Sequence, residues 1–156
     1  MVKGRTEPRL FTPPLRELTP DTSLGYAVIE YAKGILEMEL YPWQEWALIH
    51  ELDIIGDLDG EWKFRFRTVV NMVSRQNGKT MLSKVIASFF LNVLNVDSVF
   101  GTSLSLDKAE EVWEAVVQDQ ETIPILSANL QKDARTNGSK KLVLTGNRSY
   151  KVGAPT

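Results

Sequence analysis

The sequence predicts an α/β protein with a mainly parallel sheet flanked by helices, preceded by an N-terminal helical segment. Three observations lead to this prediction. After residue 60, segments with helical periodicity alternate with short β-branched runs, which is the pattern of strands connected through helices. Four prolines fall within the first 20 residues and mark an extended arm without regular structure. A chain of 156 residues with 43% apolar and 24% charged residues is large and apolar enough to bury a core.

Two helices are predicted after the arm. Apolar residues recur at helical spacing over residues 24–36. Pro42 suits the first position of a second helix, which runs to about residue 52. A turn rich in glycine and aspartate then covers residues 56–60. We therefore expect three parts: an extended Pro-rich arm (1–20), a helical segment on the adenine side (21–60) and a core (61–156).

Strands and helices alternate within the predicted core. The expected strands are residues 63–66, a buried strand at 68–73, a short strand at 98–102, and a pair at 141–145 and 149–152. The last two flank Gly146-Asn147, which favours a β-hairpin. The expected helices are residues 79–94, with an apolar stripe, and a helix that begins at Ser105 or Asp107.

Charge and composition narrow the class of protein. The chain has no cysteine, so disulfides and thiolate metal sites are excluded. Its net charge of −2 hides a block, residues 62–84, with six basic residues and no acid. Such a block around one short loop indicates a polyanion there, although a solvated surface can show the same pattern. The most apolar run, residues 85–94, is too short to span a bilayer, and we expect a soluble cytoplasmic protein.

Residues 68–82 are predicted as a strand, a tight polar loop and a helix, which is the order that a phosphate-binding loop needs. In such a loop, backbone N–H groups and the positive end of the helix attract phosphate oxygens. Lys79 would reach the β- and γ-phosphates, Thr80 would offer its hydroxyl to Mg²⁺, and Gly78 would let the backbone approach closely. Val73 stands where the general pattern has its first glycine. An ordinary turn with a surface lysine is therefore the alternative.

This departure resembles the phosphate loop of the large terminase subunit of tailed phages, a family of DNA-packaging ATPases. That family typically replaces the first glycine and places an arginine inside the loop. The resemblance implies a partial P-loop NTPase domain of the RecA-like (ASCE) type. It also implies catalytic roles for Arg75 and Lys79 at the phosphoryl-transfer transition state, whereas pairing with a nearby acid is the alternative for Arg75. The loop residues expected to bind nucleotide are Ser74, Arg75, Gln76, Asn77, Gly78, Lys79 and Thr80.

Residues 40–46 resemble the adenine-recognition segment that precedes this loop in the family. A glutamine side chain carries both a donor and an acceptor, which suits the edge of adenine. We expect Gln44 to bind adenine, with Trp43 or Tyr41 as the apolar wall, and Trp46 to lie in the core. Downstream, residues 99–113 resemble the next strand, loop and helix of the family. There, Thr102 or Ser103 would contact nucleotide or DNA.

Several other polar groups receive no firm role. Six basic residues near the C-terminus suit contacts to a phosphate backbone or simply a basic hairpin surface: Lys132, Arg135, Lys140, Lys141, Arg148 and Lys151. Three aspartates are spaced like metal ligands but are expected to lie in a solvated turn: Asp53, Asp57 and Asp59. His50 is assigned no catalytic role, and the nucleic-acid contacts stay unassigned.

The resemblance covers residues 20–156 and implies ATP and Mg²⁺ as ligands. It implies a motor in the host cytoplasm, docked transiently on a viral procapsid, that drives double-stranded DNA into it. The implied partners are double-stranded DNA, the remaining terminase polypeptide, the small terminase subunit and the portal of the procapsid, but no membrane. No apolar strand ending in Asp-Glu follows Thr80, so we expect a truncated fragment that hydrolyses ATP poorly alone, the endonuclease lying in a missing domain. A helicase-like ATPase fragment and a non-catalytic nucleotide- or partner-binding remnant are the alternatives.

Overall fold

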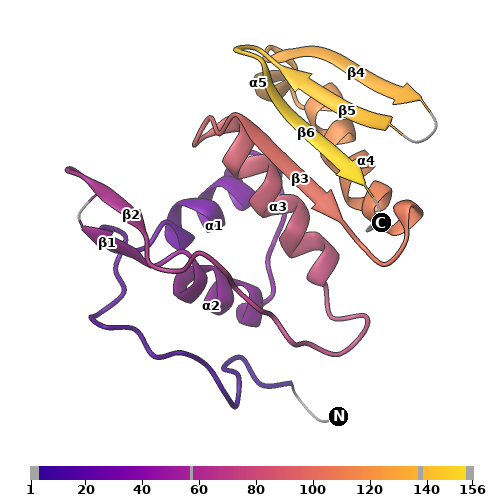
Figure 1. Cartoon of the computed structure of the whole chain (residues 1–156). Coiled ribbons are helices and arrows are strands. Elements are labelled where there is room, and N and C mark those ends of the chain that lie inside the picture. The colour runs from indigo at the N-terminus through magenta and orange to yellow at the C-terminus, as the bar shows by residue number, and fades with distance from the viewer. Residues whose placement is uncertain (1–3, 57, 137–138, 154–156) are drawn as a thin grey trace. The chain divides into compact units, whose positions relative to one another are not determined.

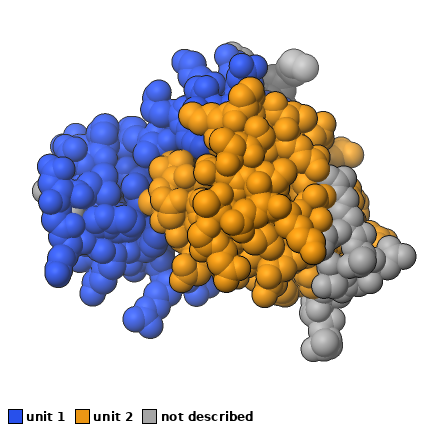
Figure 2. Space-filling model, turned by 90° about the horizontal axis from the view of Figure 1, so that it is seen from above, with its two compact units in different colours: residues 1–74 blue, residues 75–156 orange. Residues whose placement is uncertain are grey.

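The computed structural model describes residues 4–56, 58–136 and 139–153, with only the backbone of residues 134–136 and 139. The chain forms two compact units, Met1–Ser74 and Arg75–Thr156, which are coloured separately in Figure 2. The units divide at residue 74, whereas the sequence predicted a change of organisation after residue 60.

Unit 1 contains the arm, two helices and a small sheet. Helix α1 covers Gly25–Gly34 and helix α2 covers Pro42–Glu51. The two helices pack closely at Gly25, which has no side chain. A Cβ atom at this position would clash with the backbone of α2. Strands β1 (Ile54–Gly56) and β2 (Trp62–Phe64) pair antiparallel around the predicted turn, of which residue 57 lies outside the described residues.

Two arginine side chains stabilise the small sheet of unit 1. Arg65 donates to the carboxylate of Asp53 at 3.0 Å. Arg16, in the arm, donates to the carbonyl oxygens of Ile54 and Gly56. Asp53 is 2% exposed, so its expected place in a solvated turn is wrong: Arg65 compensates the charge and makes burial possible. Asp57 lies outside the described residues.

Unit 2 is a mixed α/β unit with helices over one face of a four-stranded sheet. Its helices are α3 (Lys79–Asn92), α4 (Leu106–Thr122) and the short α5 (Pro124–Ser127). Its strands are β3 (Ser98–Thr102), β4 (Leu130–Thr136), β5 (Ser139–Leu144) and β6 (Arg148–Gly153). The strand order is β3-β6-β5-β4, as Figure 1 shows.

The sheet of unit 2 is mixed rather than mainly parallel. Only β3 and β6 pair in parallel, whereas β6 with β5 and β5 with β4 are antiparallel. The physical reason is the tight connection between β5 and β6. Gly146 and Asn147 adopt positive φ angles of 80° and 62° there, and a short turn of this kind can join only antiparallel neighbours.

The core of unit 2 lies between the sheet and its helices. Trp113 of α4 is fully buried, and its indole nitrogen donates to the carbonyl oxygen of Tyr150 at 3.2 Å. It packs with Leu142 and Leu144 of β5 and with Leu91 of α3 in one apolar cluster. The expected apolar face of α4 is thereby confirmed. The face expected for α3 is confirmed only in part, because Leu82, Val85 and Phe89 are buried but Val93 is 45% exposed, and Leu91 is buried although it was not expected on this face.

The predicted elements are confirmed except in the segment before α3. Helices α1 to α4, strand β3 and the β5–β6 hairpin lie where they were predicted. The strand expected at residues 63–66 ends earlier, at Phe64, and β1, α5 and β4 were not predicted. The buried strand expected at residues 68–73 is wrong: this segment has no strand structure, and Met72 is 90% exposed. No described strand pairs with it, and a β-branched run forms a strand only with a neighbour.

None of the described helices is both long and apolar enough to cross a membrane.

Candidate functional site

The loop before α3 makes a tight turn that ends in glycine. Gln76 has a φ angle of 63° and Gly78 one of 81°, so both lie in the left-handed region that favours glycine. Gly78 is the N-cap residue of α3, and its carbonyl oxygen accepts the first helical bond, from Leu82 N–H at 3.2 Å. The amide of Asn77 donates to the carbonyl oxygen of Arg75 at 3.3 Å within the turn. A helix of 14 residues therefore starts with Lys79 and Thr80 in its first turn.

The start of α3 lies at the carboxyl end of the parallel strand pair. Helix α3 ends at Asn92, shortly before β3 begins at Ser98, so the helix runs in the opposite direction to β3. Figure 1 shows the arrowheads of β3 and β6 at the end of unit 2 where α3 begins. Ligands of α/β proteins collect at this edge. Thr102, the last residue of β3, is exposed there, and Ser103 is half-buried.

The side chains of the loop differ in exposure. Ser74, the last residue of unit 1, is exposed, as are Arg75 and Thr80, whereas Lys79 is half-buried. Arg75 makes no ion pair with any described acid, so the alternative of a structural ion pair has no support among the described residues. The basic guanidinium is thus available at the start of a helix, where the helix dipole already favours an anion.

A magnesium ion carried by a triphosphate fits Thr80. Mg²⁺ usually keeps several waters and takes one or two oxygen ligands from protein in addition to phosphate oxygens. Thr80 is exposed in the first turn of α3, and its hydroxyl offers one such oxygen. Within the described ranges, no three or more acidic or histidine side chains gather as a metal site.

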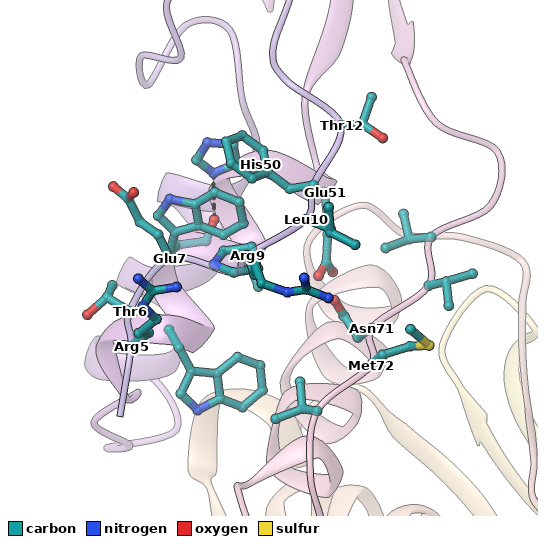
Figure 3. Close-up of a pocket in the computed structure, with 18 of the residues that line it drawn as sticks. Arg5, Thr6, Glu7, Arg9, Leu10, Thr12, His50, Glu51, Asn71 and Met72 are labelled. Carbon is teal, nitrogen blue, oxygen red and sulfur yellow. Dashed lines mark hydrogen bonds between the residues drawn. The ribbon is translucent and has the colours of Figure 1, made fainter. Parts of the chain in front are cut away.

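Unit 1 contains a pocket of about 820 Å³. Its walls come from the arm, from α2 and from residues 66–73, and Figure 3 shows side chains from all three. Trp43, expected as an apolar wall, is half-buried and lines the pocket. Tyr41, the alternative wall, is 54% exposed and is not part of the lining.

An aromatic cluster joins the arm to α2 at this pocket. The rings of Trp46 and His50 stack at 3.7 Å between centroids, and Phe11 of the arm packs edge-on against Trp46 at 5.0 Å. Trp46 is half-buried and lines the pocket, so the expectation that it lies in the core is wrong. Helical spacing shows that Trp43 and Trp46 share a face of α2, but not that the arm leaves this face partly open.

Gln44 is not exposed to a ligand, as an amide that binds adenine would have to be. It is fully buried, and its Oε1 accepts a hydrogen bond from the backbone N–H of Tyr41 at 2.7 Å. The side chain thereby satisfies a backbone group at the start of α2. Its expected contact with adenine stays a prediction.

Glu51 is a pocket residue that sequence reasoning missed. It closes α2, lines the pocket, and accepts a side-chain hydrogen bond from Asn71, toward which it extends in Figure 3. Burial raises the pKa of the Glu51 carboxyl, and the bond from Asn71 opposes that shift in part. Its Oε1 atom is buried without a hydrogen-bond partner among the described residues. A lone glutamate near a helix end carries no sequence signal for such a setting.

The structure separates the six basic residues near the C-terminus. Lys140 pairs with Glu110 at 2.8 Å and with Glu114 at 2.5 Å, both in α4, and these hydrogen bonds raise its pKa. Arg148 donates to the carbonyl oxygen of Leu91 at 2.5 Å. Two of the six therefore hold the unit together. The side chain of Arg135 lies outside the described residues, and the remaining three share the other face of the sheet by strand register: Lys132, Lys141 and Lys151.

Comparison of the chain with protein-family models, with curated proteins and with solved structures gave no significant match.

Proposed function

We propose that the chain is the ATP-binding segment of a DNA-packaging ATPase of the large terminase type, with a P-loop NTPase fold. In this proposal, residues 74–80 bind the triphosphate, Lys79 and Arg75 neutralise its charge, and Thr80 contributes one ligand to Mg²⁺. The intact motor would use ATP hydrolysis to move double-stranded DNA into a procapsid, together with the small terminase subunit and the portal.

The observation that carries the proposal is the turn before α3. Left-handed Gln76 and Gly78 direct the chain sharply into the helix, and a glycine N-cap brings no side chain between an anion and the first amides. Lys79, half-buried in the first turn of α3, adds a positive charge to the same turn, where the helix dipole also attracts phosphate. The resemblance of residues 74–80 to the terminase loop gives this geometry its specific interpretation.

The pocket in unit 1 supports a second, separate assignment. An indole face is a good surface for a nucleobase, because stacking on an aromatic ring needs no particular hydrogen-bond pattern. We assign this role to Trp43, which lines the pocket. Gln44 then has a positioning role: its bond to the N–H of Tyr41 holds the start of the helix that carries Trp43.

Replacing Lys79 tests the proposal most directly. In a titration with Mg²⁺·ATP, Lys79→Ala should weaken binding about tenfold to a hundredfold, as expected for loss of a charge-assisted bond to phosphate. Lys108→Ala is the matched control, because its side chain is exposed and pairs, among the described residues, only with Glu111 in the next turn of α4. Equal affinities of the Lys79 variant and the unaltered chain would contradict the proposal.

A further inference from the structure

The face of the unit 2 sheet that points away from α4 carries an unusual row of side chains. Strand register places Phe100 of β3 beside Lys151 of β6, and Lys151 directly opposite Lys141 of β5. Lys132 of β4 belongs to the same face, one row away, because it pairs with Val143. Alternation along the strands sends the neighbours of these residues to the core, as Leu142 and Tyr150 show.

The three lysines of this face have no acidic partner within the part of the chain that the structure describes. By contrast, Lys140, one residue from Lys141, is held by two glutamates of α4. Like charges directly opposite one another on neighbouring strands destabilise a sheet. The pair Lys141–Lys151 therefore costs folding free energy that a bound polyanion would recover.

Phe100 adds an aromatic surface to this row. The ring is 65% exposed and lies over Gly153 of β6, where an added Cβ would come within 2.9 Å of it. The glycine leaves room for the ring to rest on the neighbouring strand. A large exposed aromatic side chain beside lysines that lack a described acidic partner is not explained by the packing of the described residues of unit 2.

We propose that this sheet face, formed by Phe100, Lys132, Lys141 and Lys151, binds single-stranded nucleic acid. The lysines contact successive phosphates, and an unpaired base stacks on Phe100. Single-stranded binding sites combine these two features, a basic surface along the backbone and an aromatic ring under a base. A duplex keeps its bases stacked within the helix and would leave Phe100 without a partner, so the aromatic ring favours a single strand. The inference does not rest on the proposed binding of ATP.

The test is binding of a short fluorescein-labelled oligothymidylate to the full chain, measured by fluorescence anisotropy without nucleotide. The double variant Lys141→Gln/Lys151→Gln should bind more weakly and lower the slope of log affinity against log salt by about 1.4, or 0.7 per phosphate contact. Phe100→Ala should weaken binding about fivefold to a hundredfold through lost stacking. Matched controls are Lys63→Gln, an exposed lysine on β2 of unit 1, and Ile125→Ala, an apolar residue of unit 2 that is 62% exposed.

Three outcomes decide the matter. Weaker binding of both sheet variants, with unchanged controls and a preference for the single strand over a duplex of the same length, supports the proposal. A loss per removed charge that is as large in the Lys63 variant as in the double variant means that net charge alone drives binding and overturns it. So does a duplex that binds as tightly as the single strand with no effect of Phe100→Ala. Because all substituted side chains are exposed or half-buried, circular dichroism should show an unchanged fold, and thermal unfolding should show a slightly more stable lysine variant.

Discussion

At the scale of single residues, Glu51 is half-buried, and its Oε1 atom is buried without a hydrogen-bond partner among the described residues. Desolvation raises its pKa above the ordinary value of 4.5, which means that the folded state holds this proton more tightly than the unfolded chain. Stability then falls as the pH rises through the interval between the ordinary and the raised pKa. Other ionisable groups line the same pocket: Arg5, Glu7, Arg9 and His50.

Glu51→Gln should therefore stabilise the protein at neutral pH. The variant keeps the shape of the side chain and removes only the buried charge, so we expect a gain on the order of 1 kcal/mol. The gain should vanish below about pH 4.5, where the carboxyl is protonated in both states. Urea unfolding of both chains across this pH range measures the difference. A gain that persists at low pH would show that the charge is not its cause.

Gln44 and Glu51 show what sequence alone predicts at this scale. The resemblance of residues 40–46 to an adenine-recognition segment suggested Trp43 or Tyr41 as an apolar wall, and of these two only Trp43 lines the pocket. The burial of Gln44 and its bond to Tyr41 follow from how the helix starts, which local sequence specifies only loosely. The surroundings of Glu51 depend on the arm and on residues 66–73, which are distant in sequence and have no periodic pattern.

At the scale of elements, the start of α3 depends on one glycine. Gly78 has a φ angle of 81°, and a residue with a Cβ adopts this conformation at a cost of about 1–2 kcal/mol. Gly78→Ala should lower the free energy of unfolding by about this amount and weaken binding of Mg²⁺·ATP. Gly34→Ala is the matched control, because nothing lies within 4 Å of an added Cβ there. Chemical denaturation should show a neutral or slightly stabilising effect for Gly34, and similar losses in both variants would contradict this role of Gly78.

The elements that were predicted correctly are those whose own residues determine their structure. Strand β3 and helices α3 and α4 were predicted because each carries its own apolar pattern. The β5–β6 hairpin was predicted because Gly146 and Asn147 tolerate the positive φ angles that its turn needs. Residues 68–73 have an equally apolar pattern, but a strand requires a hydrogen-bonded neighbour, and no described segment supplies one. Whether neighbouring strands of the sheet run parallel or antiparallel likewise depends on which strands pair, and the sequence of one strand does not determine this.

At the scale of the whole molecule, the chain joins two compact units through residues that belong to no helix or strand. The junction falls between Ser74 and Arg75, and the segment from residue 65 to Gly78 has no helix or strand. The residues with the closest resemblance to a phosphate loop therefore lie at the junction itself. Exposed segments without regular structure are the first places that a protease cuts, so the same residues offer a direct probe of ligand binding.

Limited digestion with trypsin should cleave this junction early, at Arg75 and at Arg67, which are both exposed. Mass spectrometry would identify fragments that end at Arg75 and begin at Gln76. A bound triphosphate would hold the loop around Arg75 but not the segment around Arg67, because only the former belongs to the proposed phosphate site. Mg²⁺·ATP should therefore slow cleavage at Arg75 several-fold relative to Arg67, since a ligand suppresses the open state in proportion to its occupancy. Equal protection of both bonds would indicate a general stabilisation, and protection of neither would contradict triphosphate binding at residues 74–80.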